Sequence, residues 1–262
     1  MSDRGTNAGT NEPSKLTPHT QLTNRFRFFP QLNDLSDQRW LRSSAKLSEK
    51  AAASHFGSDS LQDTLIRAIA DQRGLSIKEV METFEFFSRV RKTIKAECVA
   101  DLCCGHGLLG LLFAVFERKV NRVILLDKFE PENRAKLITA AASVAPWIVN
   151  KVETQQAKLD DAQDLLPPGC SIVSAHACGV LSDRCIDIAI NKQGQLAILP
   201  CCYPKSACDA PQAIRAAFGL TAAYDIHRTY RLESAGYLVR WMEIPKLITP
   251  MNRILVARKP AG

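Results

Sequence analysis

The chain has 262 residues, of which 46% are hydrophobic and 23% charged, and its net charge is +7 at pH 7. These values exclude a disordered or collagen-like chain, and the length is sufficient for one core without disulfides. No apolar run is long enough to span a bilayer, and the N-terminus lacks the apolar centre of a signal peptide. We therefore expect a cytoplasmic protein with reduced thiols and no membrane contact.

The N-terminal part of the chain divides into a polar tail and a helical extension. Residues 1–20 are rich in Ser, Thr, Asn, Gly and Pro, which predicts a disordered tail. Residues 21–96 are predicted to be mainly helical, with a break at Gly74 and a new helix starting at Ser76. The interleaved segment 25–29, RFRFF, has the composition to stack on nucleic-acid bases, but we favour an anchor that packs on the domain.

From residue 97 to residue 262, short apolar runs alternate with amphipathic stretches. This alternation predicts an α/β domain with a doubly wound, mostly parallel, seven-stranded sheet. The last two runs have no helix between them, so we expect the final strand to be antiparallel to its neighbour. The predicted strands are 98–104, 121–127, 147–154, 170–178, 195–202, 237–244 and 252–259. The predicted helices are 107–118, 131–145, 158–165, 181–192, 210–218 and 226–235.

The most informative segment is the loop after the first predicted strand. Gly105 and Gly107 allow a tight turn and a close approach of a ligand to the backbone. Asp101 ends the strand, which suits a cationic ligand group better than a pyrophosphate. Asp127 ends the next strand, where an acid can accept hydrogen bonds from ribose hydroxyls. The loop lacks the glycine spacing of a dinucleotide site, so a reductase is not expected.

Residues 99–110, VADLCCGHGLLG, and 123–127, VILLD, resemble class I S-adenosylmethionine-dependent methyltransferases. The resemblance implies a Rossmann-like methyltransferase domain over about 97–262 and S-adenosyl-L-methionine as cofactor. It implies that Asp101, Gly105 and Gly107 hold the methionine part and that Asp127 holds the ribose.

Two further features of the expected cofactor site are the residue at position 103 and the contacts to the adenine. Cys103 stands in the same loop where the family usually has Gly, so its Cβ would narrow the loop or displace the cofactor. The resemblance also places the adenine near the end of the third strand. Asp160 or Asp161 could receive the adenine amino group there, and a solvated helix start explains these two acids equally well.

Segments 174–183, SAHACGVLSD, 199–203, LPCCY, and 248–257, ITPMNRILVA, resemble a narrower subgroup of methyltransferase domains. It includes enzymes that 2′-O-methylate an acceptor-stem nucleotide of eukaryotic tRNA, and uncharacterised methyltransferase-like proteins. The zinc modules that precede the domain in the tRNA enzymes are not visible in this sequence.

Histidine and cysteine residues follow the fourth and fifth predicted strands. His176 stands where a general base or substrate orienter could act, and Cys201 and Cys202 are expected to line the site. A metal is not favoured, because adjacent cysteines lack the C-x₂-C spacing of zinc modules. The Pro200-Cys201 pair alone is weak evidence for a covalent nucleophile. The following cysteines are assigned to packing: Cys98, Cys170, Cys185 and Cys208.

The positive charge is concentrated near the C-terminus. Residues 227–262 contain seven Lys or Arg and two Glu. Such a surface attracts phosphate backbones, so we favour RNA, tRNA or rRNA, as the methyl acceptor. A protein or small-molecule acceptor and a non-catalytic nucleoside- or RNA-binding module are the alternatives, and the sequence leaves the oligomeric state open. The predicted basic patch comprises Arg228, Arg231, Arg240, Lys246 and Arg253.

Overall fold

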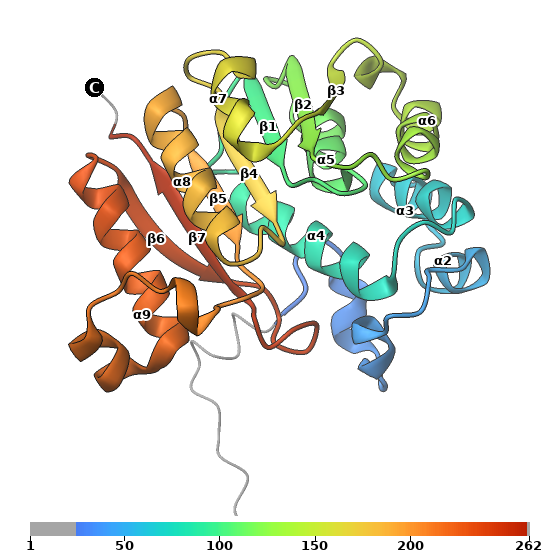
Figure 1. The fold of residues 1–262 in the computed structure, drawn as a ribbon. Coiled ribbons are helices and arrows are strands. Elements are labelled where there is room, and N and C mark those ends of the chain that lie inside the picture. The colour runs from blue at the N-terminus through green and yellow to red at the C-terminus, as the bar shows by residue number, and fades with distance from the viewer. Residues whose placement is uncertain (1–24, 261–262) are drawn as a thin grey trace, which may run out of the picture.

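A computed structural model describes residues 25–260, so the predicted tail, residues 1–20, lies outside the described part. Figure 1 shows a central sheet with helices on both faces, and the N-terminal helices α2 and α3 lie beside the sheet, near α6. The strands are β1 Cys98–Leu102, β2 Arg122–Asp127, β3 Val152–Gln156, β4 Ser171–Ala175, β5 Leu196–Leu199, β6 Leu238–Glu243 and β7 Arg253–Arg258. The α-helices are α2 Glu49–His55, α3 Leu61–Asp71, α4 Ile77–Val90, α5 Leu108–Phe116, α6 Arg134–Val144, α7 Ala162–Leu165, α8 Val180–Lys192 and α9 Gln212–Ser234.

The seven strands form one sheet in the order β3-β2-β1-β4-β5-β7-β6. Strands β1 to β5 pair in parallel, whereas β7 lies antiparallel to both β5 and β6. The predicted fold class is therefore confirmed, including the antiparallel last strand. Among residues 25–260, no helix is long and apolar enough to cross a membrane.

The strands are apolar on both faces because helices cover both sides of the sheet. In β2, Val123 and Leu125 face one buried cluster with α4 and α5, while Ile124 and Leu126 face a second cluster with α8. This period of two places consecutive side chains on opposite faces. Helix α5, LLGLLFAVF, is apolar on nearly every side because it lies between the sheet and α4.

The third strand differs from its prediction of 147–154. The chain instead forms a short 3-10 helix at Pro146–Ile148, and the strand begins at Val152. Proline at the start of that turn fixes the backbone angle φ and favours the turn over an extended strand. The two helices predicted at 210–218 and 226–235 are joined in α9, with a non-helical residue at Gly219.

The predicted extension shares a hydrophobic core with the sheet. Phe26 and Phe29 are 3% and 1% exposed, and the Phe28 ring centroid lies 4.9 Å from that of Phe84 on α4. The anchor interpretation of RFRFF is thus confirmed. Helix α4 begins as predicted at Ser76, whose hydroxyl caps the backbone of Glu79 while the Glu79 carboxylate accepts from Ser76.

A buried ion pair fastens the extension to the sheet. Nη1 of Arg89 lies 2.5 Å from Oε2 of Glu85, and both side chains are 1% exposed. The amides of Arg27–Phe28 donate to the other oxygen of the Glu85 carboxylate. The Arg89 guanidinium donates to the carbonyl oxygens of Arg25 and Glu243. One pair therefore holds the first described residues, α4 and the end of β6 together.

Replacing Glu85 with Ala should lower the free energy of unfolding by about 3–5 kcal/mol, because the Arg89 charge stays buried without its partner. Urea denaturation followed by circular dichroism measures this change. The control is Glu153→Ala, which breaks an exposed ion pair. The side chains of Glu153 and of its partner Arg122 are 44% and 42% exposed. This control should cost about 1 kcal/mol or less. Equal losses in the two variants would contradict the anchoring role.

Candidate active site

The loop between β1 and α5 turns sharply, and part of its backbone is open to a ligand. Cys103, Gly105 and Gly107 all have positive φ, of 55°, 52° and 82°. A Cβ added at Gly105 would meet no atom within 4 Å, so the backbone there is open to a ligand. A Cβ at Gly107 would lie 2.7 Å from the Leu125 side chain, so this glycine serves packing. Cys103, which stands where the family usually has Gly, adopts the left-handed conformation despite its side chain.

Two carboxylates mark the ends of β1 and β2. Asp101 is 1% exposed, and its Oδ2 accepts from the Gly110 amide at 2.9 Å. Burial raises the pKa of Asp101 to about 7, against the lowering effects of that amide and of Arg134. Asp127 Oδ2 accepts from the Gly105 amide at 2.8 Å, so this carboxylate holds the loop in position.

Arg134, at the start of α6, holds the same loop through hydrogen bonds to its backbone. Its side chain is fully buried, and its Nε and Nη2 donate to the carbonyl oxygen of Gly105 at 2.9 and 2.6 Å. Nη2 also donates to the Phe129 carbonyl after β2. This role of Arg134 could not be predicted from the sequence, because a lone arginine at a helix start has no distinctive pattern.

A cavity of about 370 Å³ lies at the carboxyl ends of β1 and β4. Its lining combines Asp101, Cys103, Gly105 and His176 with residues of α4 from the predicted extension, including Glu79. Asp127, Gly107, Asp160 and Asp161 are not part of this lining. Asp160 is exposed on the 3-10 helix Leu159–Asp161 and lies 3.7 Å from Arg184.

The cavity brings His176 against an acid that the sequence analysis missed. His176 follows β4 with φ of 75°, and its Nε2 lies 3.2 Å from Oε2 of Glu82. This distance fits an ion pair, although the geometry is not that of a hydrogen bond. Glu82 is 2% exposed and also lies near Lys78 on the cavity wall. Acids at every third position of α4, 79, 82 and 85, were the available signal.

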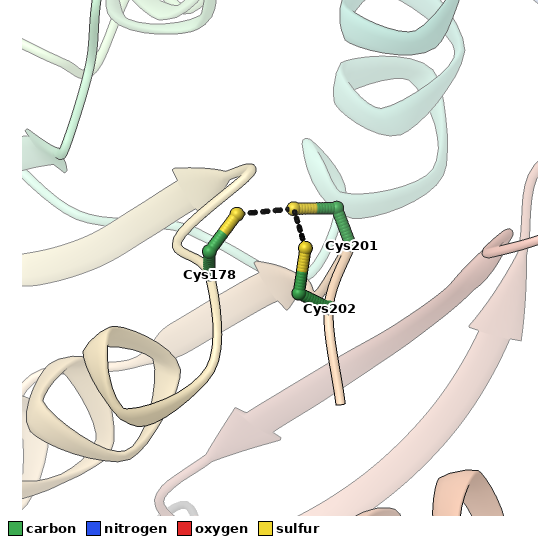
Figure 2. Close-up of side chains that lie close together, drawn as sticks. All are labelled: Cys178, Cys201 and Cys202. Atoms are coloured by element: carbon green, nitrogen blue, oxygen red, sulfur yellow. Dashed lines mark hydrogen bonds between the residues drawn. The ribbon is translucent and has the colours of Figure 1, made fainter. Parts of the chain in front are cut away.

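Cys201 and Cys202 follow β5 and line a different hollow of about 720 Å³, together with Cys178. Figure 2 shows the three thiols converging from the loops after β4 and β5. Of the cysteines assigned to packing, Cys170 and Cys185 are buried, and Cys98 and Cys208 are partly buried.

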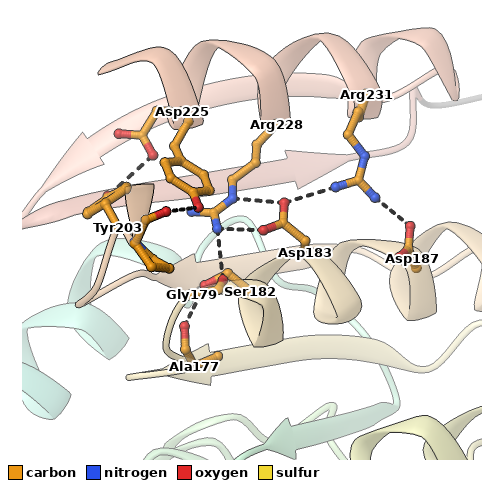
Figure 3. Close-up of polar contacts among 11 residues, drawn as sticks. Ala177, Gly179, Ser182, Asp183, Asp187, Tyr203, Asp225, Arg228 and Arg231 are labelled. Carbon is orange, nitrogen blue, oxygen red and sulfur yellow. Dashed lines mark hydrogen bonds and ion pairs between the residues drawn. The ribbon is translucent and has the colours of Figure 1, made fainter. Parts of the chain in front are cut away.

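The predicted RNA-facing patch is wrong at Arg228, which is buried, whereas Arg231 and Arg253 are partly exposed and paired with acids. Arg228 is fully buried, and its Nη2 lies 2.8 Å from Asp183 Oδ2 on α8. Arg231 is paired with Asp183 and with Asp187 on the same helix, as Figure 3 shows. The physical reason is that α9 packs on α8 through these opposite charges.

The remaining members of that patch have different surroundings. Arg253 on β7 pairs with the buried Asp225 at 2.6 Å. Arg240 and Lys246 are exposed. A broader basic surface includes Arg240 and lies at the amino ends of the parallel strands, opposite the His176 cavity. It surrounds two adjoining hollows and comprises Lys92, Lys95, Arg118, Lys119, Arg240, Arg258 and Lys259.

Known proteins resemble parts of this chain. A Xenopus laevis protein, a glutathione S-transferase C-terminal domain-containing protein, is 30% identical over 108 residues. That match covers 41% of this chain and 16% of the relative, so the chain spans about a sixth of its length. A SAM-dependent methyltransferase from Aquifex aeolicus is 17% identical, with TM-score 0.41, covering 76% of this chain and 98% of that one. The Methanococcus jannaschii fibrillarin pre-rRNA processing protein is 12% identical, with TM-score 0.41, covering 64% and 68%.

A family model described as a methyltransferase domain matches residues 76–208, half of the chain. The match runs from the N-cap of α4 through β5 and contains the loop, both carboxylates and His176. The open backbone at Gly105 and the anionic end of β1 suit a cofactor with a cationic amino-acid part. The chain therefore belongs to the methyltransferase-domain family, with S-adenosylmethionine as its cofactor.

Proposed function

We propose that this methyltransferase uses His176, held by Glu82, to orient the methyl acceptor and to take its proton. The observation that carries the proposal is the 3.2 Å approach of His176 Nε2 to a buried carboxylate within the Asp101 cavity. With Nε2 directed to Glu82, Nδ1 is the ring nitrogen left for the acceptor. Glu82 thereby fixes the orientation of the ring, as an acid does in other base–acid pairs.

The cofactor supplies a methyl group on a positively charged sulfur. Asp101 and the open backbone at Gly105 would hold its methionine part, with Cys103 and Gly107 shaping the same loop. Asp127 would receive the ribose through the lone pairs that remain on its carboxylate, because Oδ2 accepts from the Gly105 amide and Oδ1 from the Phe129 amide. Asp160 or Asp161 would receive the adenine amino group. With the cofactor bound, His176 would take the proton that the acceptor loses when it receives the methyl group and S-adenosylhomocysteine is left.

For the acceptor, we propose RNA. The support is the basic surface around Lys92 and Arg240 rather than the patch expected from the sequence. That surface lies at the opposite edge of the sheet, roughly 16 Å from the cavity along a five-residue strand. An RNA that uses both must be structured and several nucleotides long, so free nucleosides and nucleotides should be poor substrates.

A protein or small-molecule acceptor is the second candidate, and one observation favours it. Three carboxylates line or border the cavity, those of Glu79, Glu82 and Asp101. Negative charge there disfavours a phosphate backbone at the cavity mouth and favours a neutral or cationic group. The basic surface therefore favours an acceptor with phosphates, whereas the acidic cavity favours a neutral or cationic acceptor.

Labelled S-adenosylmethionine incubated with separated cellular RNA, protein and metabolite fractions distinguishes these acceptors. For RNA, the charge reversals Lys92→Glu and Lys119→Glu together should weaken RNA binding at least about tenfold at low salt, because each lost phosphate contact reduces counterion release. Filter binding at several salt concentrations measures this change. The control Lys136→Glu, on α6, should have little effect. Label in the protein or metabolite fraction only would contradict the RNA acceptor.

Replacing His176 with Gln should lower kcat by about 10²–10⁴-fold, as expected for the loss of a positioned proton acceptor. Affinity for S-adenosylhomocysteine, measured by calorimetry, should change little, because His176 acts on the acceptor. Glu82→Gln should lower kcat less, since it removes only the group that holds the ring. The control is His227→Gln on α9. Unchanged kcat in His176→Gln, with label still entering the acceptor, would exclude the proposed role.

Replacing Asp101 with Asn should stabilise the cofactor-free protein at pH 8 and leave it unchanged at pH 4. The folded pKa, about 7, is raised above the unfolded value. The contribution of Asp101 to wild-type stability is therefore fullest below about pH 4 and falls as pH rises through 7. Each pKa unit corresponds to about 1.4 kcal/mol, so the gain should reach a few kcal/mol. Thermal denaturation across this pH range measures the difference.

The same Asp101→Asn variant should bind S-adenosylhomocysteine at least about tenfold more weakly at pH 8, since it lacks the carboxylate for the ammonium group. Wild-type affinity should fall as pH drops below 7, whereas affinity of the variant should not. A variant that is stabilised and yet binds as tightly as wild type would show that Asp101 does not contact the cofactor.

A further inference from the structure

Three thiols that the proposed reaction does not use meet where β4 and β5 end. Cys178 belongs to the loop after β4, and Cys201 and Cys202 belong to the loop after β5. Sγ of Cys201 lies 2.7 Å from that of Cys178 and 3.6 Å from that of Cys202. All three sulfur atoms lie within 4.8 Å of one another. Figure 2 shows their side chains pointing toward one another.

This spacing suits a shared metal ion. A tetrahedral zinc site has Zn–S bonds of about 2.3 Å, which places its sulfur atoms ~3.8 Å apart. The separations of 2.7 and 3.6 Å lie below that value, and all three sulfur atoms lie within 4.8 Å of one another, so small side-chain rotations would open the cluster to a metal ion. Thiolates are soft donors that select zinc-class ions over magnesium or calcium. The ligands come from two strands, which is why the pair spacing in the sequence gave no metal signal.

Contacts that do not involve the thiols fix the two loops against each other. The buried Arg228 guanidinium donates to the Gly179 carbonyl at 3.1 Å, beside Cys178, and to Asp183. The same guanidinium lies over the Tyr224 ring, 4.8 Å from its centroid. Tyr224 in turn donates to the carbonyl of Pro204, two residues after Cys202. Figure 3 shows Arg228 with Gly179 and Asp183, and such contacts hold the two loops in place as supporting contacts do in metal sites.

One side of the cluster stays open. Cys178 and Cys202 are exposed, and the hollow beside them is lined by apolar residues such as Val180, Leu220 and Met251. Within residues 25–260, no fourth His, Cys or carboxylate ligand atom joins the group. Three protein ligands and one open position are typical of zinc sites that bind a substrate or water, whereas purely structural sites are closed by four.

We propose that Cys178, Cys201 and Cys202 together bind one thiophilic divalent cation of the zinc class, with its fourth position open to the hollow beside α9. The ion would cross-link the loops after β4 and β5, next to His176. This site is separate from the cofactor loop, so it stands whether or not the proposed role of His176 holds.

The full chain, reduced and freed of metal by a chelator, is titrated with Co²⁺ and then with Zn²⁺. One Co²⁺ per chain should bind, with a thiolate-to-cobalt charge-transfer absorption that one equivalent of Zn²⁺ abolishes. Cys178→Ser, Cys201→Ser and Cys202→Ser should each weaken binding by on the order of 100-fold or more, since even the loss of an outer contact costs 10–100-fold. The matched control Cys208→Ser, a partly buried cysteine outside the cluster, should bind normally.

Thermal denaturation and S-adenosylhomocysteine calorimetry on each variant show that the fold and the cofactor site are intact, independently of metal. The proposal is overturned if the triple serine variant keeps the cobalt absorption. It is also overturned if the reduced wild-type chain takes up no metal. If oxidation of that non-binding chain by air then forms a Cys178–Cys201 disulfide, found by mass spectrometry, the cluster would be assigned to redox chemistry instead.

Discussion

A carboxylate buried at the end of β1 is the constraint around which the site is built. Asp101 is 1% exposed, and such burial favours its neutral form. The Gly110 amide donates to it, and the positive charge of Arg134 lies close enough to favour the anion. Arg134 also holds the Gly105 carbonyl, so the group that offsets the buried charge also shapes the loop. A cationic ligand would complete this balance, which links cofactor binding to the cost of burying Asp101.

Helix α4 makes the extension part of the site. It packs on α5 through an aromatic face, and the Glu85–Arg89 pair ties it to the first described residues and to β6. This attachment fixes Glu82 beside His176, in the cavity that the cofactor loop also lines. The family match also begins at the N-cap of α4. Sheet and extension therefore contribute one ligand-facing surface each to a single cavity.

Local sequence patterns predicted the sheet and the loop well because their causes are local. Strands buried on both faces appear as short apolar runs, and glycines with an acid mark the turn at residues 101–107. The third strand was misplaced because β3 is an edge strand with little burial, which gives a weak pattern. The edge position also explains why the turn at Pro146 decided the local structure.

The partners of charged and thiol groups could not be predicted in this way. Arg228 was counted as surface charge, yet Asp183, 45 residues away, neutralises it in the interior. Cys178 meets Cys201 because β4 and β5 are neighbours in the sheet, and Glu82 meets His176 because helix α4 packs against the sheet domain. Such pairs depend on tertiary packing, and no spacing within one segment reports them.

A crystal structure of the chain with S-adenosylhomocysteine bound tests the central claim most directly. The account predicts that the ligand's ammonium group lies within hydrogen-bond distance of Asp101 and its ribose beside Asp127. Its sulfur should face the cavity that contains His176 and Glu82. A ligand bound elsewhere, or one whose sulfur points away from His176, would contradict this account of the site.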